Sequence, residues 1–475
     1  MGVRSSTFSM PPMPPTDRAT RCQPLFVPPL PDFPSRDLSS LAFVHRVSRN
    51  GLRVWPHRAY ELDCLEQGFF GRKRLLLNKP ELIHRVLVEN HGNYRRTDTA
   101  IRLLRPLVGD GLLLSTGENW KYQRRTIAPA LAPKMLPVLA RHVAACADEA
   151  VQSLASRNGA PVNLLAEMQS LALKIAARSM FSLETWEFGP AVRAEITRFS
   201  KQYGRAHLLD MITPLPIPTF HDFARSRFRS RWTRLLDRII DAREQVPDAG
   251  GPRDLFDLLR AARDPESGAG FDRAELRDQV GTMIVAGHET TALTLFWSLY
   301  LLASAPTQQA AVAAEVGDVD LSAAHAGETF ASLSYTRAVV SEALRLYPPA
   351  WVLSRECVEP DHVEGLSIAR GTLVMISPWV LHHHRVHWSN PDAFDPARFL
   401  PDAAPAARFT YLPFGAGPRI CVGAQFAMAE ATLVLARLIQ AYTVELADDK
   451  PVCPMAIVTT APDRVVPFRL KPRKH

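Results

Sequence analysis

The 475-residue sequence lacks a Cys-x-x-Cys pair, an internal repeat and a Gly/Ser-rich linker. Its six cysteines are scattered, which excludes a zinc-finger spacing and disfavours a disulfide framework. The N-terminus has no signal-peptide pattern, so we expect reduced thiols and a cytoplasmic protein. No linker marks a boundary after the start of the chain. We therefore predict one domain over residues 38–475, preceded by a proline-rich segment, 1–37, that is extended or disordered.

A long uninterrupted hydrophobic run is also missing. The most apolar region, 280–305, contains His288 and Glu289, which a lipid-facing helix would exclude, so we expect no membrane span. The net charge is +8, but no basic stripe with interleaved aromatic residues is present, and we expect no nucleic-acid partner. The segment 222–244 is predicted to be a helix with a solvated basic face, formed by Arg225, Arg227, Arg229, Arg231, Arg234 and Arg238; contact with a membrane surface is a second interpretation. We expect a monomer.

Hydrophobic periodicity predicts a mainly α fold with a small β-sheet region. Strands are expected within 69–78, 350–356, 365–368, 373–377 and 444–470. The segment 91–117 is predicted to be an irregular functional loop, and 189–210 to be one helix. Further helices are predicted at 37–50, 82–88, 118–127, 133–156, 162–182, 222–244, 254–263, 335–347 and 424–440.

The longest predicted helix has a capping box at its start, Asp272 with Glu275, and meets no helix breaker before Pro306. It would be about 50 Å long. Its middle reads Ala-Gly-His-Glu-Thr-Thr over 286–291, and a glycine there costs about 1 kcal/mol relative to alanine. The Thr290 hydroxyl is expected to bond to the Ala286 carbonyl and open the helix. The resulting notch could hold a small ligand and deliver protons, or could be an ordinary solvated bend.

A glycine-rich loop, Phe-Gly-Ala-Gly-Pro-Arg-Ile-Cys-Val-Gly over 414–423, carries one cysteine. Cys421 is expected just outside the N-terminus of the helix at 424–440, where the helix dipole favours a thiolate. Arg419 offers a positive charge beside the sulfur. A thiolate in a glycine-lined loop is suited to ligate a haem iron. The plain alternative is a structural cysteine in a helical scaffold.

The pattern Phe-x-x-Gly-x-Arg-x-Cys-x-Gly, with Ala-Gly-x-Glu-Thr-Thr upstream, resembles the cytochrome P450 (haem-thiolate monooxygenase) family in its soluble bacterial type. The resemblance implies the P450 fold, with haem b between the long central helix and the helix after the cysteine loop. It implies that Cys421 binds the iron and that Glu289 and Thr290 guide protons. The implied haem contacts are Trp120, Arg124, Ala286, Gly287, Arg355, Phe414, Gly415, Arg419, Cys421 and Gly423.

A second set of residues supports the resemblance. Glu342 and Arg345 are three residues apart on one helix face, and Arg398 follows within Phe394–Phe399. In the family, these three residues form a buried salt-bridge network under the haem loop. Three adjacent histidines, 382–384, are not expected to bind a metal, because neighbouring side chains in a strand or loop do not converge on one ion.

The implied reaction inserts one oxygen atom from dioxygen into a lipophilic small molecule: a lipid, terpenoid, steroid or aromatic compound. The sequence has no flavin or iron–sulfur motif, so electrons are expected from a ferredoxin or flavodoxin and its reductase, docked near Lys121 and Arg125. The alternatives are a haem-based binding or sensor protein and a peroxide-driven peroxygenase. The candidate substrate-pocket residues are Ile101, Leu104, Ala350, Val352, Leu353 and Thr460.

Overall fold

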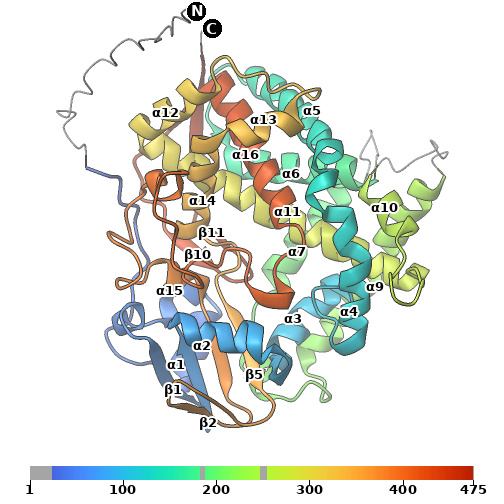
Figure 1. Ribbon diagram of the computed structural model, residues 1–475, viewed down its shortest axis with the longest axis vertical. Coiled ribbons are helices and arrows are strands. Elements are labelled where there is room, and N and C mark those ends of the chain that lie inside the picture. Colours follow the sequence, from blue (N-terminus) through green and yellow to red (C-terminus); the bar gives the residue numbers. More distant parts are fainter. Residues whose placement is uncertain (1–23, 182–187, 246–253, 474–475) are drawn as a thin grey trace, which may run out of the picture.

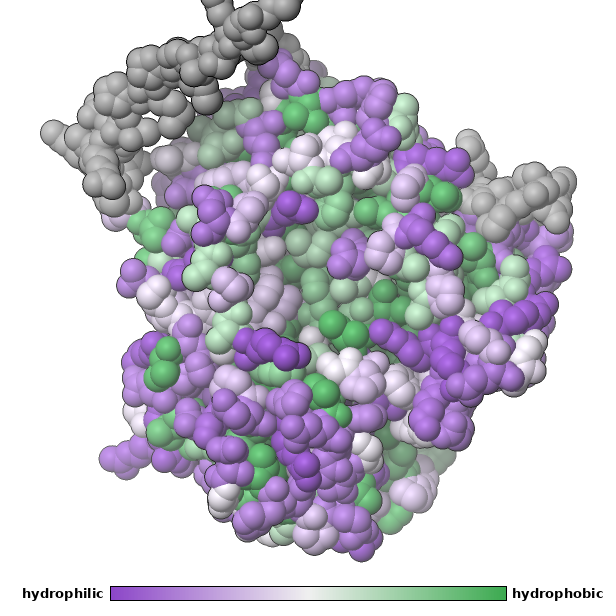
Figure 2. Space-filling model, in the orientation of Figure 1, coloured by the Kyte–Doolittle hydropathy of each residue, from purple (hydrophilic) through white to green (hydrophobic). Residues whose placement is uncertain are grey.

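The computed structural model describes residues 24–181, 188–245 and 254–473. Helices form most of it, and a smaller β-rich part lies at the lower end of Figure 1, where β1 and β2 are labelled. In Figure 2 polar residues dominate this end of the visible face, whereas apolar residues gather in a hollow near its centre. The predicted fold class, mainly α with a small β region, is confirmed.

The central element is α11 (Arg273–Ser304), a helix of 32 residues. The predicted capping box is present: the Glu275 amide donates to Asp272 at 2.8 Å, and the Asp272 amide donates to Glu275 at 3.0 Å. The helix is buried without a break from Thr291 to Leu302. It packs against α6 (Leu164–Phe181), α14 (Ser334–Leu346) and α16 (Ala424–Ala441). A helix surrounded by others on all sides must be mostly apolar all round, as the sequence of α11 is from Ala292 to Leu302 but not in its charged first half.

Six further helices overlap predicted ranges: α1 (Ser40–Val47), α2 (Pro80–His84), α4 (Gly117–Ile127), α5 (Leu136–Ala155), α9 (Phe220–Glu244) and α10 (Leu255–Ala261). Three helices were not predicted: α12 (Pro306–Val316), α13 (Ala326–Ser332) and α15 (Pro378–His382). None of the helices in the described part of the chain is long and apolar enough to cross a membrane.

Two predictions about local structure were wrong. The segment 91–117 is not irregular, because it contains the helix α3 (Asp98–Val108), which Thr97 caps by accepting from the Ala100 amide. Pro106 near its end disguised the helical pattern. The region 189–210 is two helices, α7 (Gly189–Gln202) and α8 (Leu208–Ile212), rather than one. The chain turns at Gly204, which packs on Phe199 and Val458 with no room for a side chain.

The predicted solvated face of α9 needs a partial correction. Arg225 and Arg243 are 2% exposed and pair with Asp210 and Asp254, at 2.7 and 2.9 Å. Both carboxylates are fully buried. These arginines hold neighbouring segments to the helix, and only the other arginines of α9 reach its surface.

The main sheet has five strands in the order β1-β2-β8-β5-β3. Only β2 and β8 run parallel. The strands are β1 (Cys64–Phe69), β2 (Arg72–Leu77), β3 (Tyr94–Arg96), β5 (Leu353–Cys357) and β8 (Leu373–Ile376). The pairing of β3 with β5 places Arg96 directly opposite Arg355. Residues about 260 positions apart in the sequence are thereby brought to one edge of the interior.

The C-terminal strands bring one further segment to the centre. The three-stranded sheet β4-β12-β9 comprises β4 (Val162–Asn163), β12 (Pro467–Pro472) and β9 (Tyr442–Leu446). Beside it, β10 (Pro454–Ala456) pairs with β11 (Thr460–Pro462) as a hairpin. Trp297 of α11 donates to the Thr460 carbonyl at 2.9 Å, and this bond fixes the hairpin tip, residues 457–459, against the middle of α11. The short pair β6 (Asp361–Val363) and β7 (Leu366–Ile368) lies apart.

Candidate functional site

The cysteine loop precedes α16 as predicted, and its backbone is set by glycine. Gly417 has φ +71°, and a Cβ there would lie 2.0 Å from the Leu87 carbonyl oxygen, so only glycine fits. The Cys421 amide donates to the Phe414 carbonyl at 2.9 Å, which closes the loop. Helix α16 starts at Ala424, and Cys421 lies two residues before its N-cap, Gly423. The side chain of Cys421 lines a large cavity.

The protonation of Cys421 differs from the sequence prediction. Burial raises the pKa of its thiol, and the Gly423 amide and the Arg124 charge only partly oppose this effect. The helix dipole therefore does not by itself make a thiolate here. A bound metal ion would favour the thiolate, since metal binding displaces the thiol proton.

Across the cavity, the predicted hydrogen bond in α11 is present, but the helix is continuous there rather than opened; we call the cavity-lining stretch 286–290 the notch. The Thr290 hydroxyl donates to the Ala286 carbonyl, and Ala286, Gly287, Glu289 and Thr290 all line the cavity. The Thr459 hydroxyl, from the hairpin tip, donates to Glu289 at 3.1 Å. Burial raises the pKa of Glu289, although this hydrogen bond opposes the shift. A carboxyl group with a raised pKa and a hydroxyl thus lie side by side on the wall facing Cys421.

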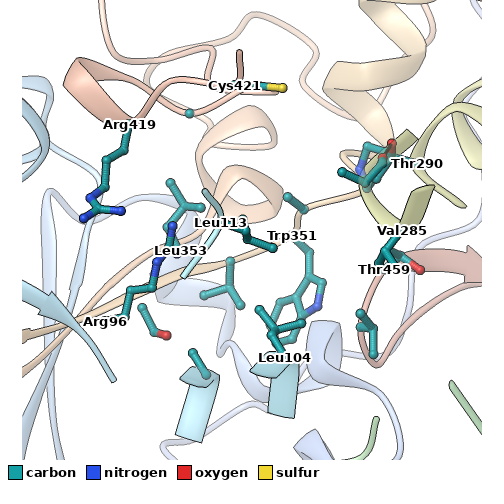
Figure 3. A pocket seen from close by; sticks show the side chains of 18 of the residues that line it. Arg96, Leu104, Leu113, Val285, Thr290, Trp351, Leu353, Arg419, Cys421 and Thr459 are labelled. Atoms are coloured by element: carbon teal, nitrogen blue, oxygen red, sulfur yellow. Dashed lines mark hydrogen bonds between the residues drawn. The ribbon is translucent and has the colours of Figure 1, made fainter. Parts of the chain in front are cut away.

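Three arginines converge on the cavity from separate elements: Arg96 of β3, Arg355 of β5 and Arg419 of the cysteine loop. Burial and the two neighbouring charges lower the pKa of Arg96 to about 9, and burial with the Arg419 charge lowers that of Arg355 to about 10. Within the described residues, none of the three has a carboxylate partner. Figure 3 shows Arg96 and Arg419 together on one side, with Cys421 above them and Thr290 on the opposite side.

The cavity that joins these groups has a volume of about 870 Å³ and an apolar wall. Figure 3 shows Leu104, Leu113, Trp351 and Leu353 below the level of Cys421. A space of this size, apolar with a few convergent polar groups, has the character of a cofactor and ligand site.

Four of the six predicted substrate-pocket residues line this cavity: Leu104, Ala350, Val352 and Leu353. Ile101 does not, because Ala100, Leu103 and Leu104 form the face of α3 that reaches the cavity. Thr460 does not either, since it is fully buried and donates its hydroxyl to the Pro348 carbonyl at 2.7 Å. Its neighbour Thr459 lines the cavity instead, as expected where successive residues of an extended chain point in opposite directions.

Comparison with known proteins places this arrangement in a family. The family model described as cytochrome P450 matches residues 65–466. This chain belongs to the cytochrome P450 family. Like other members, it is an oxidoreductase of the monooxygenase class that uses haem b.

Three curated P450 relatives show the extent of the similarity. Cyclooctatin synthase from Streptomyces melanosporofaciens is 35% identical, covering 79% of this chain and 82% of the relative. Cyclooctat-9-en-7-ol 5-monooxygenase from the same organism is 34% identical, covering 82% and 80%. Pentalenene oxygenase from Streptomyces avermitilis is 31% identical, covering 91% and 93%. The crystal structure of the cytochrome P450DA heme domain shares the fold, with a TM-score of 0.78 at 24% identity over 95% of this chain and 99% of that one.

The residues of the cavity fit the haem of the P450 family. Two buried arginines opposed across paired strands, with a third beside them and no acid to balance them, require an anionic occupant; haem carries two propionates. The other requirement, a cysteine facing the same space, is met by Cys421. The cysteine loop and the notch of α11 stand on opposite sides, so a flat group fits between α11 and α16.

Two predicted haem contacts are engaged within the protein. The Arg419 guanidinium lies 4.5 Å from the ring centre of Trp120, a cation–π contact that keeps it facing the cavity. Arg124 donates to the Ile420 carbonyl at 2.8 Å and so lies beside the cysteine rather than in the arginine cluster. Phe414, Gly415 and Gly423 also line the cavity.

The predicted charge network of the P450 chain is present but uneven. Arg345 donates twice to Glu342, at 2.7 and 2.8 Å, and both side chains are fully buried. Arg398 is 3.5 Å from Glu342, without a hydrogen bond to it, and its side chain is 12% exposed. Arg345 also donates to three backbone carbonyls, those of His382, Pro391 and Ala393. The Glu342–Arg345 pair therefore joins α14 to the segment before the cysteine loop.

Sequence reasoning missed Arg96, and it considered the ranges 350–353 and 459–461 for the pocket without selecting Trp351 or Thr459. Arg96 lies in a segment predicted to be irregular, and nothing local distinguishes it from Arg95. Trp351 lies inside a range considered for the pocket, between Ala350 and Val352. Thr459 differs from Thr460 only in the direction of its side chain. The pairing of strands far apart in the sequence brings Arg96 to the cavity, and the register of a short hairpin points Thr459 into it.

Proposed function

We propose that this P450 inserts one oxygen atom from dioxygen into a terpenoid, with electrons delivered by a separate ferredoxin or flavodoxin and its reductase. The observation that carries the proposal is that Cys421 faces, across one apolar cavity, a buried carboxyl group with a raised pKa, Glu289, and the adjacent hydroxyl of Thr290. A binding or sensor protein has no need of a proton source at this place.

Haem, when bound, supplies the iron at which dioxygen is activated. In the proposed arrangement, Cys421 holds the iron from the α16 side, and Arg96, Arg355 and Arg419 hold the propionates. Trp120 keeps Arg419 in place through its ring. Arg124 keeps the cysteine loop closed and places a positive charge near the sulfur.

Burial disfavours the charged form of Glu289 and so raises the pKa of its carboxyl group, which favours its role as a proton donor. The Thr459 hydroxyl positions this carboxyl through one oxygen, which leaves the other free to donate. Thr290, bound to the Ala286 carbonyl, presents its hydroxyl oxygen at the notch. We propose that these two residues pass protons to dioxygen from the α11 side, as positioned general acids do.

The terpenoid assignment rests on the apolar lining of the cavity and on the relatives, whose names refer to cyclooctat-9-en-7-ol and pentalenene. Leu104, Leu113, Val285, Trp351 and Val352 offer hydrocarbon contacts and no charge. The test is a titration of the purified haem protein with a panel of terpenes, steroids, fatty acids and aromatics. Shifts of the haem spectrum with terpenes at the lowest concentrations support the assignment; tighter binding by another class contradicts it.

The electron donor is proposed from family membership. The basic pair singled out in the sequence does not offer free charge: Lys121 pairs with Glu118 at 2.7 Å, and Arg125 pairs with Asp264 and Glu266 at 2.8 and 3.1 Å. Reconstitution with a ferredoxin or flavodoxin, its reductase and NADPH tests the whole proposal. Product formed with peroxide alone would favour the peroxygenase instead, and no product under either condition would favour a sensor.

A further inference from the structure

Trp351 forms part of the cavity wall and carries a polar group that the protein does not use. The residue is 6% exposed and lines the cavity. In the view of Figure 3, its ring lies below Thr290, with the indole nitrogen on the side of Thr459. Among the residues that the structure describes, the Nε1–H group of Trp351 has no hydrogen-bond acceptor. A buried N–H group without an acceptor calls for an explanation.

The other tryptophans show how this fold treats the same group elsewhere. Four buried indole N–H groups donate to protein oxygens at distances between 2.7 and 3.2 Å, those of Trp232, Trp297, Trp379 and Trp388. Trp55 also lacks an acceptor, but it does not line the cavity. Trp120 lines the cavity, but its ring contacts Arg419 on the side proposed for the propionates. Trp351 therefore differs from them by holding a free donor on the apolar wall.

Most hydroxyl groups of the cavity wall are already used within the protein. Six of them donate to backbone carbonyls or to the Glu289 carboxyl group, those of Thr99, Ser179, Thr282, Thr290, Thr294 and Thr459. Within the described ranges, the hydroxyls of Thr213 and Thr291 make no such bond. A threonine hydroxyl in a helix can rotate toward the carbonyl four residues earlier, whereas an indole N–H points in one direction only. Trp351 is thus the donor that most needs an acceptor from outside the protein.

The ring of Trp351 is held in one orientation. Gly51 lies against the outer edge of its six-membered ring, because a Cβ at Gly51 would be 2.3 Å from Cη2 and 2.4 Å from Cζ2. The backbone is fixed as well, since the Trp351 carbonyl accepts from the Ser377 hydroxyl at 2.8 Å and from the Trp379 amide at 3.4 Å. A ring held in this way keeps its N–H in a fixed direction, so the acceptor has to come to it.

The segment that carries Trp351 is also tied to α11. The Thr460 amide donates to the Pro349 carbonyl at 3.3 Å, and Trp297 of α11 donates to the Thr460 carbonyl at 2.9 Å. These bonds join Trp351, the hairpin tip and α11 into one unit. A ligand atom bound at the indole N–H would therefore stand at a fixed place relative to the notch, and this place decides which carbon of the ligand faces the notch.

We propose that Trp351 donates its indole N–H to an oxygen atom that the terpenoid already carries, so that the enzyme prefers a hydroxylated or carbonyl-bearing terpenoid to a terpene hydrocarbon. This inference rests on the proposed function, which supplies the terpenoid class. A hydrocarbon that fills the cavity keeps water from the N–H and offers no acceptor, whereas an alcohol or a ketone of the same skeleton satisfies it. A reaction that places oxygen on the hydrocarbon, either an earlier oxidation or a cyclisation ended by water, must then precede this one.

The test is spectral titration of the purified haem protein with matched ligand pairs: a sesquiterpene hydrocarbon and its alcohol, a diterpene hydrocarbon and its ketone, and a steroid hydrocarbon and its ketone. The natural protein should bind the oxygenated member of a pair about tenfold more tightly, as one hydrogen bond allows. In Trp351→Phe this preference should disappear, because the smaller ring affects both members alike and only the N–H distinguishes them. Thr213→Val, which removes a free hydroxyl from the same cavity, should keep the preference.

Two further measurements test the geometry. Gly51→Ala should displace the ring and reduce the preference, whereas Gly68→Ala, at a position with open space around it, should not. The carbonyl stretching frequency of a bound ketone should be lower in the natural protein than in Trp351→Phe, since a donated hydrogen bond weakens the C=O bond. The haem spectrum verifies folding of each variant.

The outcomes separate this inference from the proposed function. A preference that survives in Trp351→Phe, a carbonyl frequency that this variant leaves unchanged, or no binding of any oxygenated ligand overturns the role of Trp351. If the steroid pair alone binds and shows a preference that depends on Trp351, the donor role stands and the terpenoid assignment fails.

Discussion

Arg96 and Arg355 face each other across two paired antiparallel strands, and Arg419 lies near both. Like charges in directly opposed positions destabilise a sheet, and here the protein supplies no acid to balance them. In the proposed arrangement, the haem propionates would provide the missing negative charge. The repulsion among these arginines destabilises the haem-free protein, and binding of an anionic cofactor would relieve it.

This relationship predicts opposite effects of one substitution on the two forms of the protein. Arg96→Gln should weaken haem retention by about 1.5–3 kcal/mol, the value of a hydrogen bond to a charged group, and should leave the haem-free protein as stable as before or more so. Haem transfer to an acceptor apoprotein and thermal unfolding measure the two quantities. Arg95→Gln, at the exposed neighbouring position, is the control. Equal destabilisation of both forms would show a purely structural role.

Cys421→Ser should remove the thiolate signature of the reduced protein with carbon monoxide, because a hydroxyl does not replace the sulfur as a ligand. Cys146 and Cys357, which are buried away from the cavity, serve as controls: Cys357→Ser should retain the spectrum. A spectrum that survives Cys421→Ser and is lost on changing another cysteine would place the ligand elsewhere.

Glu289→Gln should lower product formation by about a hundredfold, since a positioned acid contributes on that scale, while substrate-induced spectral shifts remain. Thr459→Val removes only the hydrogen bond to the carboxyl group and should have a smaller effect. Product per NADPH consumed is the measurement. Full coupling in Glu289→Gln would exclude this residue as the proton source.

The charge network predicts graded losses of stability. Arg345→Leu leaves Glu342 buried and unpaired and should cost about 3–5 kcal/mol. Arg398→Leu should cost less, because this arginine is partly exposed and makes no hydrogen bond to Glu342. Denaturant unfolding of the haem protein measures both. Equal losses would mean that the longer 3.5 Å contact is as important as the bidentate pair.

Glu430 on α16 is 3% exposed and has no hydrogen-bond or ion-pair partner among the described residues, and burial raises its pKa to about 8. The folded protein holds this proton more tightly than the unfolded chain. The destabilisation of the folded protein by Glu430 therefore grows as the pH rises above the ordinary carboxyl pKa, and it levels off above pH 8. The free energy of unfolding of the Glu430→Gln variant, relative to that of the natural protein, should rise by about 2 kcal/mol or more between pH 6 and pH 9. If the free energies of unfolding of the natural protein and the variant changed with pH in parallel, a raised pKa of Glu430 would be contradicted.

The sequence by itself determined the elements whose signals are local. The capping box and the absence of breakers defined α11, the glycines and the cysteine defined the loop before α16, and the spacing of Glu342 and Arg345 placed them on one face. Thr290 bonds to Ala286 because that contact is internal to one helix turn. Each of these features depends on residues within a few positions of each other.

Tertiary structure alone decided which distant residues share the cavity. Arg96 joins Arg355 through strand pairing, and Thr459 rather than Thr460 reaches Glu289 through the register of a hairpin. The pKa of Cys421 is likewise decided by burial, which outweighs the local helix dipole. Contacts between segments hundreds of residues apart and removal from water leave no local pattern in the chain, because both arise only when the elements pack together.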